Sequence, residues 1–273
     1  MRKLNQSIGD EFAKTITDNS LKKLYGVEYE HFSSPDISEL KVRVSKKNEL
    51  NREAGEYLTL DIINFSNKVK EKLITKLTIA IKQMMGKSFK KVLFLGMGND
   101  NIISDSLGSA TMDKIDILDL LEADSEVQFA KFSPSVFAVS GMESFDIIRA
   151  IENIFKPDVV IVVDSLCARS VERLGRSFQI TDAGITPGSA VGSNVCKLTS
   201  ETLGGAKVLS VGVPLVVYLQ AVVEEALIKI SPLDEYSLGT IDAFDGIYSP
   251  KEIDEYISFS SDVIAKALMR VFT

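Results

Sequence analysis

Two aspartates that follow apolar runs of the chain could act together on one substrate. Asp105 lies in the glycine-rich loop after the run VLFL, and Asp164 directly follows the run VVIVV. Runs of this kind are typical of buried parallel strands. In an open α/β sheet, ligands bind outside the carboxyl ends of the strands, where carboxylates from two strands can converge. We therefore predict a two-carboxylate site, with one group as general acid and the other as general base.

Each aspartate also has a purely structural interpretation. Asp105 could cap a helix that begins at SLGSA, and the sequence favours this role and the catalytic one equally. Asp164 could cap the segment SLCARSVERLGR, but a carboxylate after five apolar residues is costly to bury without a partner or a function. Function is therefore favoured for Asp164. Glu143 and Asp146 could join the acidic cluster, although a helix cap and a first-turn acid explain them better.

Other catalytic chemistries lack the residues they need. His31 is the only histidine, and it lies in a polar segment, so a serine or cysteine nucleophile has no evident base. Cys167 and Cys196 are predicted to pack as small apolar residues and not to form a disulfide framework. The same shortage of histidine excludes a histidine-rich metal site, whereas a metal held by oxygen ligands between the carboxylates stays open. No cofactor is expected, because GMGNDN lacks the third glycine of the dinucleotide fingerprint.

The composition indicates one α/β domain in a reducing, aqueous compartment. With 273 residues, 45% of them hydrophobic, the chain can bury a sizeable core. A net charge of -7 gives no reason to expect a nucleic-acid partner, and charges interrupt every apolar stretch well short of a membrane span. The N-terminal MRKLNQSIGDEFAK lacks the apolar core of a secretory signal. We expect a cytoplasmic protein.

The order of apolar patterns predicts a three-layer α/β/α domain with a mainly parallel sheet. Residues 12–50 are expected to form a loosely packed segment with an edge hairpin around LKVRVS, and residues 57–85 one or two amphipathic helices. The run SVFAVSGMES is interpreted as a strand, followed by a helix and the strand VVIVV, which gives a parallel crossover. FQITDAGITPGSAVGSN is expected to be a long structured loop. Ser249, Pro250 and Glu252 form a capping box that predicts a final helix.

Several segments, taken in order, resemble one protein family. GMGNDNIISDSLG, VSGMES, PDVVIVVDSLCARSVERLGRSFQITDAGITPGSAVGSN and SETLGGAKVLSVGVPLVV are similar to segments of the germination proteases of endospore-forming bacteria, aspartic-type endopeptidases that degrade small acid-soluble spore proteins. The likeness extends over roughly residues 40–270. It implies a fold similar to hydrogenase-maturation endopeptidases, a homo-oligomer that is a tetramer, and a location in the spore core. It also maps the two essential aspartates onto Asp105 and Asp164.

The resemblance implies further site residues and a processing site. Supporting or substrate-binding roles are expected for Gly98, Asn99, Glu143, Arg169, Asp182, Gly184 and Gly188. The family is made as a self-processing zymogen, and DEFA at residues 10–13 matches the pattern at which its substrates are cut, so cleavage between Glu11 and Phe12 would make residues 1–11 a propeptide. Two alternatives remain at this point: a metal-dependent maturation endopeptidase that uses the same aspartates, and a catalytically impaired homologue that binds spore proteins.

Overall fold

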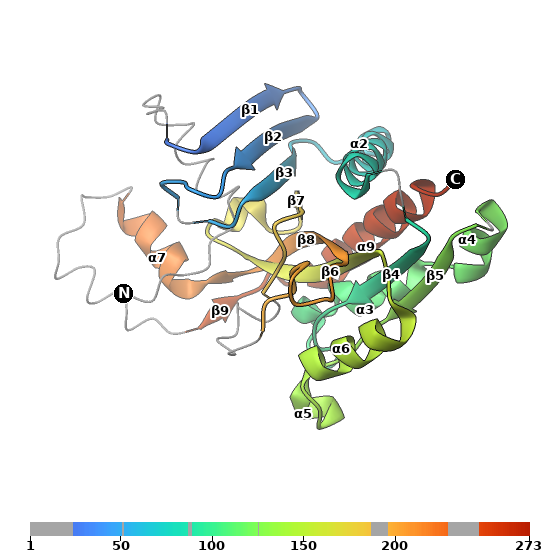
Figure 1. Cartoon of the computed structure of the whole chain (residues 1–273). Helices are drawn as coiled ribbons and strands as arrows, with labels where there is room; N and C mark the ends of the chain where they lie inside the picture. The colour runs from blue at the N-terminus through green and yellow to red at the C-terminus, as the bar shows by residue number, and fades with distance from the viewer. Residues whose placement is uncertain (1–23, 51, 87–88, 125, 187–195, 229–245) are drawn as a thin grey trace.

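The computed structural model describes residues 24–50, 52–86, 89–124, 126–186, 196–228 and 246–273 (Figure 1). The expected propeptide and its cleavage site at Glu11 and Phe12 lie outside the described residues, as does Gly188. None of the helices in the described ranges is both long enough and apolar enough to cross a membrane.

A single mixed sheet organises the described part of the chain. Its strands are β1 (Val27–Ser33), β2 (Ile37–Val44), β3 (Gly55–Ile62), β4 (Lys91–Gly96), β5 (Gln128–Phe132), β6 (Val159–Ala168), β7 (Ser177–Thr181), β8 (Lys207–Tyr218) and β9 (Ile247–Tyr248). They lie in the order β1-β2-β3-β7-β8-β6-β4-β5, and β9 pairs with β8 (Figure 1). The neighbours β8, β6, β4 and β5 are parallel, and the remaining pairs are antiparallel.

The α/β class is therefore confirmed, but the sheet is not mainly parallel. Three of the eight strand pairings between described residues are parallel. Strands buried on both faces read as continuous apolar runs, which made the parallel half visible in the sequence. The antiparallel strands β3 and β7 alternate apolar with polar residues over a short length, and this weaker pattern was assigned to a helix and to a loop.

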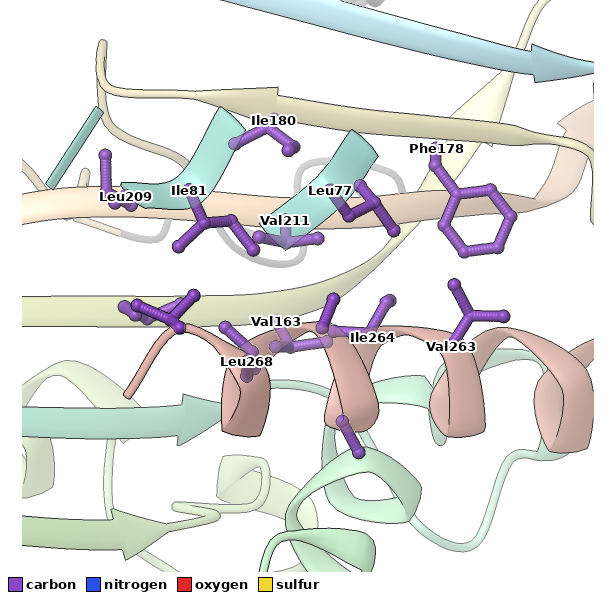
Figure 2. Close-up of a cluster of buried hydrophobic side chains, with 14 of the residues drawn as sticks. Leu77, Ile81, Val163, Phe178, Ile180, Leu209, Val211, Val263, Ile264 and Leu268 are labelled. Atoms are coloured by element: carbon purple, nitrogen blue, oxygen red, sulfur yellow. The ribbon is translucent and has the colours of Figure 1, made fainter. Parts of the chain in front are cut away.

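Helices cover both faces of the sheet and complete the three layers. They are α2 (Asn67–Met85), α3 (Leu107–Lys114), α4 (Ile117–Ala123), α5 (Phe137–Ser140), α6 (Ser144–Phe155), α7 (Leu219–Ile228) and α9 (Ile253–Arg270), with 3₁₀ turns η1 (Ile103–Asp105) and η2 (Val171–Arg173). The larger core lies between one sheet face and α2, α3 and α9, where Leu77, Ile81, Val163, Val211 and Ile264 meet (Figure 2). The smaller core covers the opposite face and contains Val160, Val162 and, from α6, Ile148.

Several local predictions were wrong for identifiable reasons. The helix expected over residues 57–85 begins only at Asn67, where the Ser66 side chain accepts a hydrogen bond from the Val69 N–H. SVFAVSGMES contains the short helix α5, and the strand lies before it as β5. The capping box does not form, because the Ser249 hydroxyl donates to the carbonyl of Leu215 at 3.4 Å and α9 starts without a side-chain cap.

The described part of the N-terminal segment is more ordered than expected. Residues 27–44 form the antiparallel pair β1 and β2, and β2 continues the sheet through β3. β1 is mostly exposed, in agreement with loose packing, but Leu40, Val42 and Val44 of β2 form a small buried cluster. The hairpin around LKVRVS is thus present and is anchored to the sheet by its second strand.

Candidate active site

Asp164 lies within β6, where the parallel part of the sheet approaches its carboxyl edge. Its side chain is 4% exposed, and the residue pairs with Gly212 of β8. Side chains alternate between the faces of a strand, so Asp164 shares a face with Val160 and Val162 of the smaller core. Among described residues, neither Asp164 nor Asp105 forms an ion pair with a lysine or arginine.

Asp105 is held beside the end of β4 by the glycine-rich loop. It is the last residue of η1, and the Asn99 N–H donates to its Oδ2 at 2.9 Å and to its main-chain carbonyl at 3.1 Å. Gly98 has φ +122°, and a Cβ there would lie 1.9 Å from the Asp105 carbonyl oxygen. Only glycine fits such a position. Gly98 and Asn99, both expected to support the site, are thus in direct contact with Asp105.

A second glycine contact fixes the helix that follows Asp105. A Cβ on Gly96, at the end of β4, would lie 2.5 Å from the carbonyl oxygen of Gly108 in α3, and a Cβ on Gly108 would lie 2.2 Å from the carbonyl oxygen of Met97. The helix can therefore approach the strand end closely. This helix–strand contact was not predicted, because it depends on where the helix packs against the strand end.

Burial raises the pKa of both carboxyls. The pKa of Asp164 rises to about 8, because burial disfavours its charge and the neighbouring charge of Asp105 adds to the effect, while a backbone hydrogen bond from Ser165 opposes it. The pKa of Asp105 rises to about 6, mainly through burial, with the Asn99 hydrogen bond acting against it and the Asp100 charge adding to it. Asp105 ionises first, while Asp164 is still neutral, so only the second ionisation meets a like charge.

The pair therefore holds one proton near neutral pH. Asp105 is then the carboxylate, able to take a proton from water, and Asp164 is the neutral acid, able to give one. Environments that push two neighbouring pKa values apart separate an acid role from a base role. The arrangement is chemically suited to hydrolysis by general acid and general base.

The other expected site residues lie in varied settings. Glu143 precedes α6, is exposed, and makes no side-chain cap bond. The Asp182 Oδ1 accepts from the Glu56 N–H at 2.7 Å, which ties β7 to the start of β3. Gly184 has φ +83° and packs against the Leu198 carbonyl. No described hydrogen bond links any of these three to the aspartates.

Cys167 and Arg169 follow Asp164 closely in the chain, whereas Cys196 lies on the surface. The Arg169 guanidinium lies 3.2 Å from a Glu224 carboxylate oxygen of α7. Cys167, in β6, is partly buried, whereas Cys196 is exposed, so the packing predicted for Cys196 is wrong, and neither cysteine forms a disulfide with another described residue. The His31 Nε2 is hydrogen-bonded to the Ser38 hydroxyl at 2.9 Å, in the exposed hairpin at the far end of the sheet from β6. The histidine is thus remote from Cys167.

The described residues contain no group of three or more histidine, cysteine, aspartate or glutamate side chains placed to hold a metal ion. Asp105 and Asp164 would supply two carboxylates to a cation, with no third histidine, cysteine, aspartate or glutamate from the described residues. The geometry consequently gives the metal-dependent alternative little support among the residues described.

Comparisons with known proteins point to one family. The family model described as "Germination protease" matches residues 6–230. A germination protease of Clostridium tetani is 29% identical over 91% of this chain and 83% of its own length. The germination protease of Bacillus pumilus is 35% identical over 64% of this chain and 52% of its own length, and that of Oceanobacillus iheyensis is 32% identical over 72% and 58%.

The chain belongs to the germination protease family, which is a family of peptidases. The matched region spans only about half the length of several of these relatives, such as those of Caldanaerobacter subterraneus and Bacillus pumilus, at 55% and 52%. Among solved structures, a [NiFe] hydrogenase maturation protease HycI from Thermococcus kodakarensis aligns with a TM-score of 0.37 and 18% identity, over 69% of this chain and 98% of that one.

Proposed function

We propose that this protein is an aspartic-type endopeptidase that hydrolyses small acid-soluble spore proteins. The observation that carries the proposal is a buried carboxyl, Asp164, beside a half-buried one, Asp105, with pKa values raised to about 8 and about 6, in a member of the germination protease family. Spore proteins are the substrate class that the family name and the sequence resemblance suggest. An accessible peptide bond in a flexible chain suits a site of this kind.

Each aspartate has one role in the proposed reaction. The Asp105 carboxylate takes a proton from a water molecule, whose oxygen adds to the carbonyl carbon of the peptide bond. The Asp164 carboxyl gives its proton to the leaving nitrogen as the carbon–nitrogen bond breaks. Asp105 then releases its proton to solvent and Asp164 takes up a proton from solvent, which restores the starting state. Peptide and water become a carboxylic acid and an amine, with no other reactant.

The proposals for activation and assembly are based on the sequence resemblance to germination proteases. We propose that the protein is a zymogen that cuts its own chain between Glu11 and Phe12, and that it works as a homo-oligomer, a tetramer, in the spore core. DEFA at residues 10–13 supports the cleavage site. Intact-mass measurement at mildly acidic pH should show loss of the first eleven residues, and the loss should disappear in Asp164→Asn. A protein that digests spore proteins while keeping residues 1–11 would contradict this route.

Digestion of a purified spore protein tests the function. The wild type should cleave it, Asp105→Asn and Asp164→Asn should not, and Asp146→Asn, which changes an exposed acid of α6, should cleave at the wild-type rate. Activity that a chelator abolishes and added metal restores would favour the metal-dependent alternative. A wild type that binds the substrate without cutting it would favour the impaired homologue.

A further inference from the structure

A polar row crosses the sheet next to Asp164. Gln179 of β7 pairs with Gly212 of β8, which pairs with Asp164 of β6, and on its other side Gln179 pairs with Thr59 of β3. Side chains that are directly opposite in neighbouring strands project from the same face. Thr59, Gln179 and Asp164 thus share one face of the sheet, with glycine between the last two.

The adjacent row, on the other face, is entirely apolar. It consists of Leu58, Ile180, Val211 and Val163, again linked by strand pairing. Figure 2 shows Ile180, Val211 and Val163 within the core against α2 and α9. Packing alone therefore explains that row, whereas it does not explain a glutamine and an aspartate in equivalent positions on the opposite face.

The Gln179 amide nitrogen is buried and has no hydrogen-bond partner among the described residues. A buried donor without an acceptor costs about 1–3 kcal/mol, so such a group calls for an explanation. The nitrogen can only donate, and the acceptor it lacks is consequently an oxygen that another molecule could bring.

Gly212 determines what lies between the amide and the acid. A Cβ at residue 212 would lie 2.7 Å from Leu166 Cγ and 2.8 Å from the Asp164 carbonyl oxygen, so no larger residue fits there without a shift. Strands two apart in a sheet are separated by about 9–10 Å. Because residue 212 has no side chain, the Leu166 side chain of β6 fills the space over it, and no polar group of β8 comes between Gln179 and Asp164 in this row.

We propose that Gln179 is a substrate-binding residue of the two-aspartate site, whose amide N–H donates a hydrogen bond to a main-chain carbonyl oxygen of the peptide bound beside Asp164. The inference rests on the proposed function, because it takes a peptide as the ligand. In the complex, the peptide carbonyl oxygen accepts a hydrogen bond from the Gln179 amide. This hydrogen bond fixes the register of the peptide relative to Asp164. Preorganised donors of this kind contribute to catalysis only when substrate is present.

Gln179→Met tests the proposal, with Gln128→Met, which changes an exposed glutamine of the edge strand β5, as the matched control. Removal of the donor should lower kcat/KM for a spore-protein substrate about 10- to 100-fold. It should leave the melting temperature unchanged or raise it, because it also removes a buried donor without a partner. The control should keep wild-type kcat/KM. A fall in activity that comes with a lower melting temperature would assign Gln179 a structural role and overturn the proposal.

A second variant and a binding measurement separate this inference from the proposed function. Gln179→Glu puts a carboxylate near the pair and should move the pH–activity profile to higher pH, since a like charge raises the pKa of both aspartates. Equal kcat/KM in wild type and Gln179→Met would refute the role of Gln179 and leave the protease function standing. If the wild type cleaves nothing, the function fails, and the affinity for a spore-protein peptide then decides: weaker binding by Gln179→Met supports the inference, and equal or absent binding overturns it.

Discussion

Glu39 and Asp164 are two buried acids of the same sheet with opposite protonation behaviour. Their exposed fractions are similar, 8% and 4%. Burial acts to raise the pKa of Glu39, but hydrogen bonds and charges from Lys76 and Lys41 outweigh it and lower the pKa overall. Asp164 is subject to the same effect of burial and faces the like charge of Asp105 in place of a cation, so its pKa rises to about 8.

The difference lies in what the neighbouring elements supply. Glu39 lies on β2, where Lys76 of the crossing helix α2 and Lys41 of the same strand bind its two carboxylate oxygens. Asp164 lies within β6, one residue beyond the last pairing of β6 with β4, where the loop after β4 brings a second acid. A buried acid with cationic partners is a fixed ion pair, and removal of one partner destabilises the fold. A buried acid without them keeps its proton at neutral pH and can donate it.

The largest expected effect separates the two acids by activity. Asp164→Asn should abolish proteolysis, with a loss of at least about 1,000-fold in kcat, because the amide cannot donate a carboxyl proton. Glu39→Gln should retain activity within about twofold and instead lower the free energy of unfolding by about 1–3 kcal/mol, because it disturbs a buried ion pair. Substrate digestion and urea denaturation of both variants measure the contrast. An active Asp164→Asn enzyme with a normal fold would remove the basis of the comparison.

The next effect concerns the loop that brings the second acid to the first. Gly98→Ala should reduce kcat by about 100-fold, since its Cβ would lie 1.9 Å from the Asp105 carbonyl and displace that residue. Gly86→Ala is the matched control: Gly86 also has a positive φ, +82°, but a Cβ there meets nothing within 4 Å. The control should lose about 1 kcal/mol of stability and no activity. Equal activity in the two variants would show that the position of Asp105 is unimportant.

The pH dependence of stability should have opposite signs for the two acids. An acid whose pKa is raised by folding stabilises the protein below its unfolded pKa, and this stability is lost as pH rises through the folded pKa. Because of Asp164, the free energy of unfolding should therefore fall by about 1.4 kcal/mol per pH unit between about pH 4 and the folded-state pKa of Asp164, about 8. The pKa of Glu39 is lowered, so its contribution is present above pH 4.5 and is lost toward lower pH.

Denaturation at pH 5, 6, 7 and 8 checks these signs. The wild type should become less stable from pH 6 to 8, and Asp164→Asn should flatten that decline, whereas Glu39→Gln should leave it unchanged. A decline of the same slope in wild type and Asp164→Asn would mean that the Asp164 carboxyl is already ionised in this range.

The smallest expected effect is on the thiol of β6. Cys167→Ala should keep wild-type activity within about twofold, because Cys167 is partly buried, His31 lies at the other end of the sheet, and the carboxyl pair needs no thiol. Alkylating reagents should act only through their bulk. Complete loss of turnover in Cys167→Ala would restore thiol chemistry as a candidate.

The sequence was informative where burial leaves few choices. Uninterrupted apolar runs predicted β4 and β6, and with them the places of Asp105 and Asp164, because a strand covered on both faces must be apolar throughout. The sequence was uninformative where one face of a strand is polar. Gln179 lies within the short alternating strand β7, but its segment FQITDAGITPGSAVGSN was predicted to be a loop throughout. Gly212 gave no signal inside its apolar run, because its importance depends on which strands flank it.

The pKa difference was predictable only in outline. Two carboxyls close together imply that one keeps its proton, but the residue types alone do not assign the acid and base roles. The assignment depends on the Asn99 hydrogen bond to Asp105 and on the fuller burial of Asp164, and both are tertiary features. The same holds for Glu39, whose partner Lys76 is separated from it by 37 residues in sequence.

The most direct test is an NMR titration of the aspartate carboxyl carbons in ¹³C-labelled protein, assigned with the two asparagine variants. One resonance should titrate near pH 6 and vanish in Asp105→Asn, and the other should titrate near pH 8 and vanish in Asp164→Asn. In Asp105→Asn the remaining Asp164 transition should move to lower pH, because the like charge is gone. Two carboxyls that both titrate near pH 4, independently of each other, would contradict the shared proton on which the account depends.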